Sequence, residues 1–251
     1  MMYSDFASVY DVLTENVNYE KRAEYILKLF KKHGHIPQNM IDAACGTGSF
    51  SVMFAKSGIN VIGVDFSEEM LCMAQNKAFS ENLSIPFICQ SLVNLNTGKK
   101  YDSAVCLLDS LNHIISEDDL QTAFLKISES LTDDGIFIFD VNTIYKHSEI
   151  LKDNTFVIEK ENLFCVWQNE LVDNDIVEIT LDFFTNQNNS YQRKSDFFAE
   201  RAYSHEHILK MLKNARLSFL SVYDDMHFCA PLENSERVFY VAKKNQGVTC
   251  S

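Results

Sequence analysis

The chain has 251 residues, 46% of them hydrophobic and 23% charged, so it is long enough for a sizeable folded core and disorder is not expected. Its 22 basic and 35 acidic side chains give a net charge of −13, which repels a phosphate backbone and argues against a nucleic-acid partner. The seven cysteines are scattered without a C-x-x-C pair, the start lacks signal-peptide character, and no apolar run approaches ~20 residues; these features favour a cytoplasmic protein with reduced, packed thiols and no membrane contact.

The first half of the chain alternates helix-like and strand-like segments. In chain order the expected elements are a helix over 19–32, a strand over 40–44, a helix over 50–56, a strand over 60–66, a helix over 68–78 capped by Ser67, strands over 85–89 and 102–108, a helix from Ser116 to about 131, and a strand over 135–141. Apolar strands between amphipathic helices are typical of a parallel sheet covered on both faces. The predicted fold class is therefore α/β, doubly wound.

The pattern changes after residue 141. Strands are expected without intervening helices at 156–160, 163–170, 176–185 and 191–198, which predicts an aromatic antiparallel insert. We assign residues 1–143 and 199–251 to the main domain and 144–198 to the insert, which either packs on that domain or covers an active-site mouth as a lid. A helix capped by Ser204 and an antiparallel strand pair at the sheet edge, 218–223 and 237–243, then complete the chain.

The stretch "MIDAACGTGSF" places two of only eight glycines, Gly46 and Gly48, directly after a predicted strand. Glycines there bring bare backbone amides to a ligand at a helix N-terminus. Asp65 ends the next strand, close to the spacing of a carboxylate that binds ribose hydroxyls. Ser51 stands where a nicotinamide fingerprint has its third glycine, which argues against NAD.

Four motifs resemble one known family. "IDAACGTGSF", "VIGVDFSEEML", "YDSAVCLLDSLNHI" and "LTDDGIFIFDVNT" are similar to the motifs of class I S-adenosylmethionine-dependent methyltransferases, and "AERAYSHEHILKMLKNA" and "ERVFYVAKK" resemble their bacterial small-molecule branch. The resemblance spans most of the chain and is least specific over the insert. It implies a Rossmann-like seven-strand sheet in the order 3-2-1-4-5-7-6, with strand seven antiparallel.

The resemblance also implies where S-adenosylmethionine binds. Asp42 would orient the loop and reach the methionyl ammonium, Asp65 would bind the ribose, Phe66 would lie on the adenine, and Ser91 stands where relatives often carry an acidic residue near the adenine. The full implied set is Tyr10, Asp42, Ala44, Cys45, Gly46, Gly48, Asp65, Phe66, Met70, Gln90, Ser91, Leu92 and Leu108. No metal is expected.

Three residues are candidates for catalysis. Asp109 and His113 follow the fourth strand, where either could steer or deprotonate an acceptor, and Tyr10 matches a tyrosine that closes over the cofactor in the resembling branch. Tyr145, Glu200 and Arg201 are weaker candidates. Phe198 stands near a position where relatives often have histidine, so no second catalytic histidine is expected.

These features favour in-line methyl transfer to a small-molecule N or O acceptor, with S-adenosylhomocysteine as product, by a monomer or homodimer. An NAD(P)-binding oxidoreductase and a non-catalytic cofactor-binding regulatory protein stay open as alternatives. Nucleic-acid methylation is disfavoured, because "LLDS" lacks the Asn or Asp, two prolines and aromatic residue that base-modifying relatives carry after strand four.

Overall fold

A seven-stranded sheet forms the centre of the computed structural model, which describes residues 4–173, 175–187 and 190–245. Its order is β10-β11-β5-β4-β1-β2-β3; β11 runs antiparallel to both of its neighbours, and all the other neighbouring pairs are parallel. This confirms the expected order and the edge hairpin. The strands are β1 Asn39–Ala43, β2 Asn60–Asp65, β3 Phe87–Cys89, β4 Tyr101–Cys106, β5 Leu131–Asn142, β10 Leu217–Asp224 and β11 Arg237–Lys244.

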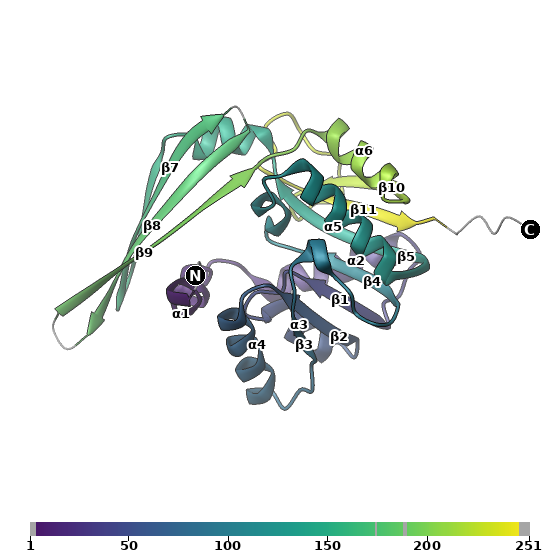
Figure 1. Cartoon of the computed structure of the whole chain (residues 1–251), viewed down its shortest axis with the longest axis horizontal. Helices are drawn as coiled ribbons and strands as arrows, with labels where there is room; N and C mark the ends of the chain where they lie inside the picture. The colour runs from purple at the N-terminus through teal and green to yellow at the C-terminus, as the bar shows by residue number, and fades with distance from the viewer. Residues whose placement is uncertain (1–3, 174, 188–189, 246–251) are drawn as a thin grey trace, which may run out of the picture.

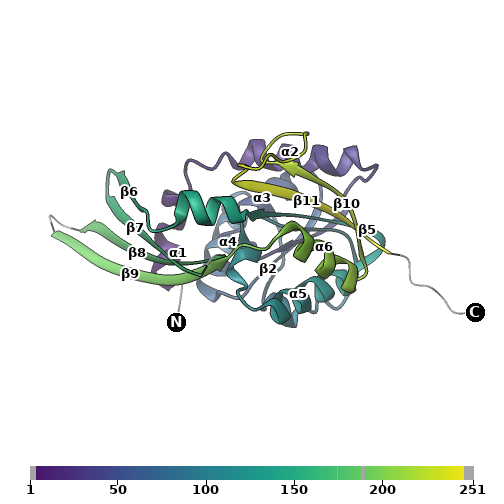
Figure 2. The same ribbon diagram turned by 90° about the horizontal axis from the view of Figure 1, so that it is seen from above.

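Helices cover both faces of this sheet (Figures 1 and 2). Helices α2 (Tyr19–Lys32) and α3 (Ser49–Lys56) bury their apolar residues against one face, and α5 (Glu117–Ser130) and α6 (His205–Asn214) against the other. Helix α4 (Glu68–Ser80) lies beside α3, β2 and β3. The fold is the doubly wound α/β class predicted from the strand and helix pattern. None of the described helices is long and apolar enough to cross a bilayer.

Three serines begin helices as the sequence predicted. The side chains of Ser67, Ser116 and Ser204 each accept a hydrogen bond from the backbone amide three residues later, at 3.1, 3.3 and 3.2 Å. Each bond satisfies one amide that the first helical turn leaves without a partner. Local chemistry therefore sets where α4, α5 and α6 begin.

A second sheet holds four antiparallel strands, which confirms the antiparallel strands expected after residue 141. They are β6 Thr155–Lys160, β7 Leu163–Asp173, β8 Ile176–Gln187 and β9 Ser190–Arg201. One face buries Cys165, Val177, Ile179 and Phe183 together with Val9 of helix α1 (Ser4–Leu13). Figure 1 shows α1 between this sheet and α4.

Several sequence expectations were wrong in detail. Strand β4 ends at Cys106 rather than Leu108, because Leu108 and Asp109 adopt left-handed backbone angles. Helix α1 was not predicted, and neither were the 3₁₀ turns η1 (Leu92–Asn94) and η2 (Ser110–His113) or the π-helical turn η3 (Lys146–Leu151). The expected packing of the cysteines was only partly right: Cys106 and Cys165 are buried, whereas Cys72, Cys89 and Cys229 are exposed. Cys250 lies outside the described residues.

Candidate active site

A cavity of about 430 Å³ opens where β1, β2 and β4 end. Ligands of open α/β sheets bind at this edge. The loops after these strands form one side of the cavity, and α1 and the four-stranded sheet form the other. Eleven of the fifteen predicted cofactor-binding and catalytic residues line it, and so does the weaker candidate Glu200; the eleven are Tyr10, Asp42, Ala44, Cys45, Gly46, Asp65, Phe66, Met70, Leu108, Asp109 and His113.

The two glycines of the turn do different things. Gly46 (φ 53°) lines the cavity, and a Cβ built there would meet nothing within 4 Å. Gly48 (φ 74°) lies outside the described lining, and its Cβ would come within 2.8 Å of the Ala74 Cβ on α4. Gly46 therefore presents backbone to the cavity, whereas Gly48 lets α3 and α4 approach each other.

Three further predicted residues also lie outside the described lining of the cavity. Leu92 is buried in the hydrophobic core beside α5. The Gln90 side chain accepts a hydrogen bond from the Asn96 amide at 3.0 Å, and Ser91 is exposed. A role of these residues in cofactor binding stays a prediction.

Asp65 ties the ends of two neighbouring strands together. Its carboxylate accepts the Gly46 amide at 2.8 Å and the Ser67 amide at 3.0 Å. Burial raises the pKa of this carboxyl, while the backbone hydrogen bonds oppose the shift. An ionised carboxylate offers about four lone-pair positions, more than the backbone amides of Gly46, Phe66 and Ser67 use, so it can also accept a hydrogen bond from a ligand.

Asp42 and Ser51 explain why the third glycine is absent. Ser51 is fully buried at the start of α3, and its hydroxyl donates to the Asp42 carboxylate at 2.5 Å. Burial raises the pKa of Asp42 to about 7. A glycine at position 51 would leave this buried carboxylate without its side-chain donor, which is costly in a low-dielectric site.

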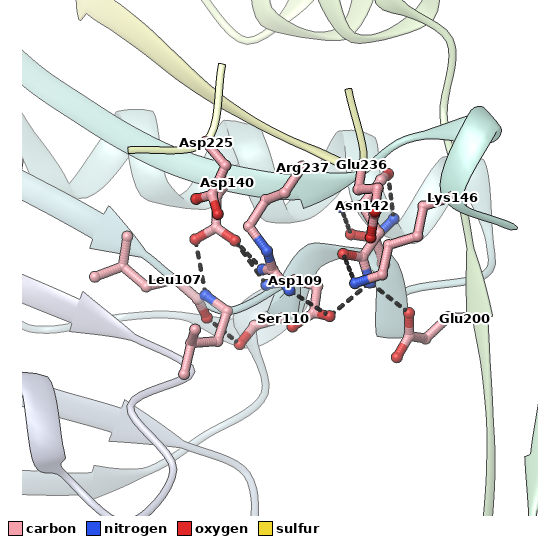
Figure 3. A network of polar contacts seen from close by, with 12 residues as sticks. Leu107, Asp109, Ser110, Asp140, Asn142, Lys146, Glu200, Asp225, Glu236 and Arg237 are labelled. Carbon is pink, nitrogen blue, oxygen red and sulfur yellow. Dashed lines mark hydrogen bonds and ion pairs between the residues drawn. The ribbon is translucent and has the colours of Figure 1, made fainter. Parts of the chain in front are cut away.

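The Asp109 carboxylate lies in a buried ion-pair network at the opposite end of the cavity (Figure 3). It accepts Arg237 Nη2 at 3.0 Å and Asn142 Nδ2 at 2.5 Å, and Arg237 also donates to Asp140. Although burial opposes ionisation, the positive charges of Arg237 and Lys146 hold the pKa of Asp109 below its usual range. Asp109 is therefore an anion with little capacity to take a proton.

His113 faces a second buried carboxylate. Its Nε2 lies 3.8 Å from Glu200 Oε1, and its Nδ1 is buried without a hydrogen-bond partner. Asn142 Nδ2 donates to Glu200 Oε2 at 3.0 Å, and His147 Nε2 lies 3.6 Å from the same oxygen. Because Glu200 comes from β9, this contact joins the four-stranded sheet to the loop after β4. Tyr145 and Arg201 lie outside the described lining.

Five residues important to this end received no role from the sequence: Asp140, Asn142, Lys146, Trp167 and Arg237. Lys146, Trp167 and Arg237 line the cavity, and Lys146 donates to Asn142 Oδ1 at 2.9 Å. Burial and the nearby Arg237 lower the Lys146 pKa. The sequence held a usable signal for Asp140, which is an acidic residue within the apolar strand "GIFIFDV". The positions of the other four residues depend on contacts between segments that are far apart in the chain.

Helix α1 is fastened to the glycine turn. Thr47 Oγ1 donates to Asp11 Oδ1 at 2.7 Å, and Lys77 Nζ lies 2.9 Å from Asp11 Oδ2. These contacts hold Tyr10 against the cavity, where burial raises the pKa of its phenol. Among the described residues, no cluster of three or more His, Cys, Asp or Glu side chains is arranged to hold a metal ion.

The sheet order and the cavity at its carboxyl edge define a Rossmann-like α/β protein with a ligand site at that edge. Residues 40–135 match the family model described as a methyltransferase domain. A methyltransferase-family protein of Geobacillus sp. (strain WCH70) is 34% identical over 247 residues, which cover 97% of this chain and 100% of that protein.

Two further relatives agree. A crystal structure of an S-adenosylmethionine-dependent methyltransferase from Clostridium acetobutylicum ATCC 824 has 35% identity and a TM-score of 0.89, covering 97% of this chain and 99% of that one. A glycine/sarcosine N-methyltransferase of Aphanothece halophytica is 24% identical over 241 residues, 92% of this chain and 86% of that protein. The chain belongs to the class I S-adenosylmethionine-dependent methyltransferases, and this membership decides against the NAD(P) oxidoreductase alternative.

Proposed function

We propose that this methyltransferase modifies a small-molecule N or O acceptor enclosed between the loops of the main sheet and the four-stranded sheet, which acts as a lid. The single observation that carries the proposal is the cavity itself. It joins the Gly46–Asp65 end to the His113–Glu200 end beneath an apolar wall that includes Ile158 and Leu181. A volume of about 430 Å³ lies in the usual range of small-molecule sites, roughly 300–1,000 Å³.

The Gly46 end fits S-adenosylmethionine. The open space above Gly46 leaves room for a ligand against the backbone, and the Asp65 carboxylate, an acceptor at the edge of that space, suits ribose hydroxyls. Phe66 is 56% exposed beside Asp65, so its ring offers a flat apolar surface to a base. Asp42 would face the methionyl ammonium, and Met70 would pack beside the nucleoside.

When bound, S-adenosylmethionine supplies a methyl group carried on a positively charged sulfur. The main task of the protein is to hold the acceptor in line with the methyl carbon and to exclude water. Tyr10 on α1, together with Trp167 and Leu181 of the four-stranded sheet, would enclose the acceptor, since all three line the cavity.

His113 is the best-placed proton acceptor for a protonated amine or a hydroxyl. Its ring lines the cavity, and Glu200, whose Oε1 lies 3.8 Å from His113 Nε2, would stabilise the imidazolium that forms when the ring takes the proton. Asp109 is the poorer base because Arg237 holds it ionised. Its role in the proposal is to balance charge and to fix the loop.

The named activities of relatives support a small acceptor. The Aphanothece halophytica protein is named for glycine and sarcosine, which are small amines. The net charge of −13 also disfavours nucleic acid. Cytoplasmic location and a monomeric or homodimeric state remain part of the proposal.

Calorimetry with S-adenosylhomocysteine tests the cofactor end. We expect wild-type protein to bind and Asp65→Ala to weaken binding about 10- to 100-fold, because hydrogen bonds to a charged group are lost. Asp102→Ala is the matched control: this carboxylate also accepts backbone amides, from Gln38 and Asn39, but it lies at the opposite end of the sheet. Equal affinities in all three proteins would contradict the assignment.

Transfer itself is tested with S-adenosylmethionine labelled in the methyl group and an ultrafiltered bacterial extract as the acceptor source. Label should move into a low-molecular-weight product, and His113→Ala should slow that movement about 100-fold or more. Binding of S-adenosylhomocysteine without any labelled product would favour the non-catalytic alternative.

A further inference from the structure

The turn after β4 has an unusual backbone. Leu108 and Asp109 are consecutive non-glycine residues in the left-handed region, each with φ 54°. A leucine rarely adopts this conformation, because its Cβ crowds the following carbonyl oxygen, which disfavours the turn about tenfold or more, whereas aspartate tolerates it better. The segment from the turn onward carries Leu108, Asp109, Ser110 and His113 into the cavity.

One buried carboxylate holds this turn. Asp140, 1% exposed on β5, accepts the Leu108 amide at 2.7 Å and the Asp109 amide at 3.1 Å. Successive backbone amides around an anion form a compact binding nest. Each hydrogen bond to a charged group favours the turn by about tenfold or more, which is enough to offset the backbone cost.

A single guanidinium balances the charges. Arg237, the first residue of β11, donates to Asp140 and, through Nη2, to Asp109 at 3.0 Å (Figure 3). Its planar fork therefore joins the carboxylate beneath the turn to the carboxylate on the turn. Without it, the buried Asp140 carboxylate and the half-buried Asp109 carboxylate would lie together with only partial compensation, and such uncompensated charge is costly.

We propose that Asp140 and Arg237 are positioning residues for methyl transfer: they impose the left-handed turn at Leu108–Asp109 and thereby place His113 opposite Glu200. The proposal rests on the proposed function for its catalytic part only. Both residues act through the turn, which Asn142 links onward to Glu200 by donating to Asp109 at 2.5 Å and to Glu200 at 3.0 Å.

Asp140→Asn is the sharpest perturbation. A carboxylate only accepts, whereas an amide of the same shape has one accepting oxygen and one donating nitrogen. The nitrogen would have to face the Leu108 amide, the Asp109 amide or Arg237, all of which are donors. Arg237→Gln is the second variant, in case the first does not fold. Arg237→Lys keeps the charge but loses the fork, so it should recover only part of the function.

Amide hydrogen exchange measures the stability of the turn directly and does not require the methyl acceptor to be known. The Leu108 and Asp109 amides should lose about tenfold or more protection in Asp140→Asn and Arg237→Gln. Asp102→Asn is the matched control, since Asp102 also accepts two successive amides, Gln38 at 3.1 Å and Asn39 at 2.8 Å, outside the cavity. It should lose protection at its own two amides and keep it at the turn.

Measurements of methyl-transfer turnover and of S-adenosylhomocysteine affinity test the catalytic part of the proposal. With labelled S-adenosylmethionine and an ultrafiltered bacterial extract, Asp140→Asn should lose about tenfold or more in apparent kcat per folded molecule, while S-adenosylhomocysteine affinity stays within about threefold. Asp102→Asn should keep its turnover. If Asp140 and Arg237 only stabilised the fold, Asp140→Asn and Arg237→Gln would have lower melting temperatures, and their turnover per folded molecule would be unchanged.

Two results would overturn the proposal: turn amides that stay protected in both Asp140→Asn and Arg237→Gln, or lost protection with turnover equal to that of Asp102→Asn. Absence of product from the wild type would instead refute the proposed function. The exchange measurement would still decide whether Asp140 and Arg237 impose the turn.

Discussion

Alanine substitution at each glycine of the turn tests whether Gly46 and Gly48 serve different purposes. Both residues have positive φ, 53° and 74°, so both variants carry the cost of a left-handed alanine. Only at position 48 does the new Cβ meet protein, 2.8 Å from the Ala74 Cβ and 3.2 Å from the Ala74 Cα, whereas at position 46 it meets nothing within 4 Å. Comparing the two variants therefore isolates the helix contact.

The magnitudes follow from these two contributions. A left-handed alanine costs about 1–2 kcal/mol in either variant. Overpacking against the α4 backbone adds about 1–3 kcal/mol at Gly48 only. Since each kcal/mol shifts the melting temperature of a chain of this size by about 2–4 °C, Gly48→Ala should melt about 2–12 °C below Gly46→Ala.

Thermal unfolding followed by circular dichroism measures that difference, and calorimetry with S-adenosylhomocysteine measures binding below the transition. We expect Gly46→Ala to fold but to bind more weakly, because its methyl group enters the cavity. Gly48→Ala should bind normally while it is folded. Two variants that melt within about 1 °C of each other would refute the close-approach argument.

Three further predictions concern single side chains. Burial raises the pKa of Asp42 to about 7 from the 3.8 of a free aspartate, so the unfolded chain loses its proton first and stability falls as pH rises from about 4 to about 7; urea unfolding should show the wild type losing up to about 4 kcal/mol relative to Asp42→Asn over that interval, and parallel curves would contradict this. Trp167 is the one tryptophan of the chain and lines the cavity, so S-adenosylhomocysteine should change the protein's fluorescence, and saturation seen by calorimetry without any emission change would place the ligand elsewhere. Lys77→Met removes the ion pair to Asp11 and should speed S-adenosylhomocysteine dissociation by up to about fivefold in stopped-flow measurements, whereas Lys28→Met, which breaks an exposed pair with Glu24, should not.

The sheet and its ligand edge were predictable because their signals are local. Strand β2 reads as an apolar run that ends in Asp65, and Ser67 begins the following helix through its own side chain. The glycine turn follows β1 directly. Each feature depends on residues within a few positions of one another, so the sequence alone was enough to place them at one edge of the sheet.

The acceptor end was less predictable because its contacts join distant segments. Arg237 meets Asp109 across 128 positions and Asp140 across 97. Nothing near Arg237 in the sequence distinguishes it from a solvent-exposed charge at the start of a strand. Its role depends on β11 lying beside β5, so the residue pairing could be found only after the strands were aligned. Helix α1 was missed for a related reason: its apolar residues pack against strands that come some 150 positions later.

The two ends of the cavity share one structural arrangement, which is built from different residues at each end. At each end a buried aspartate on one strand accepts amides from a left-handed turn after the neighbouring strand: Asp65 from Gly46, and Asp140 from Leu108 and Asp109. The turn after β1 has one non-glycine residue with positive φ, Ala44 (φ 56°), and the amide bonded to Asp65 comes from a glycine, which adopts such a backbone at little cost. The turn after β4 has two consecutive ones, Leu108 and Asp109, and there the structure supplies two amide bonds and Arg237. Where side chains rather than glycines line the cavity, a buried ion pair thus helps to hold the same backbone shape.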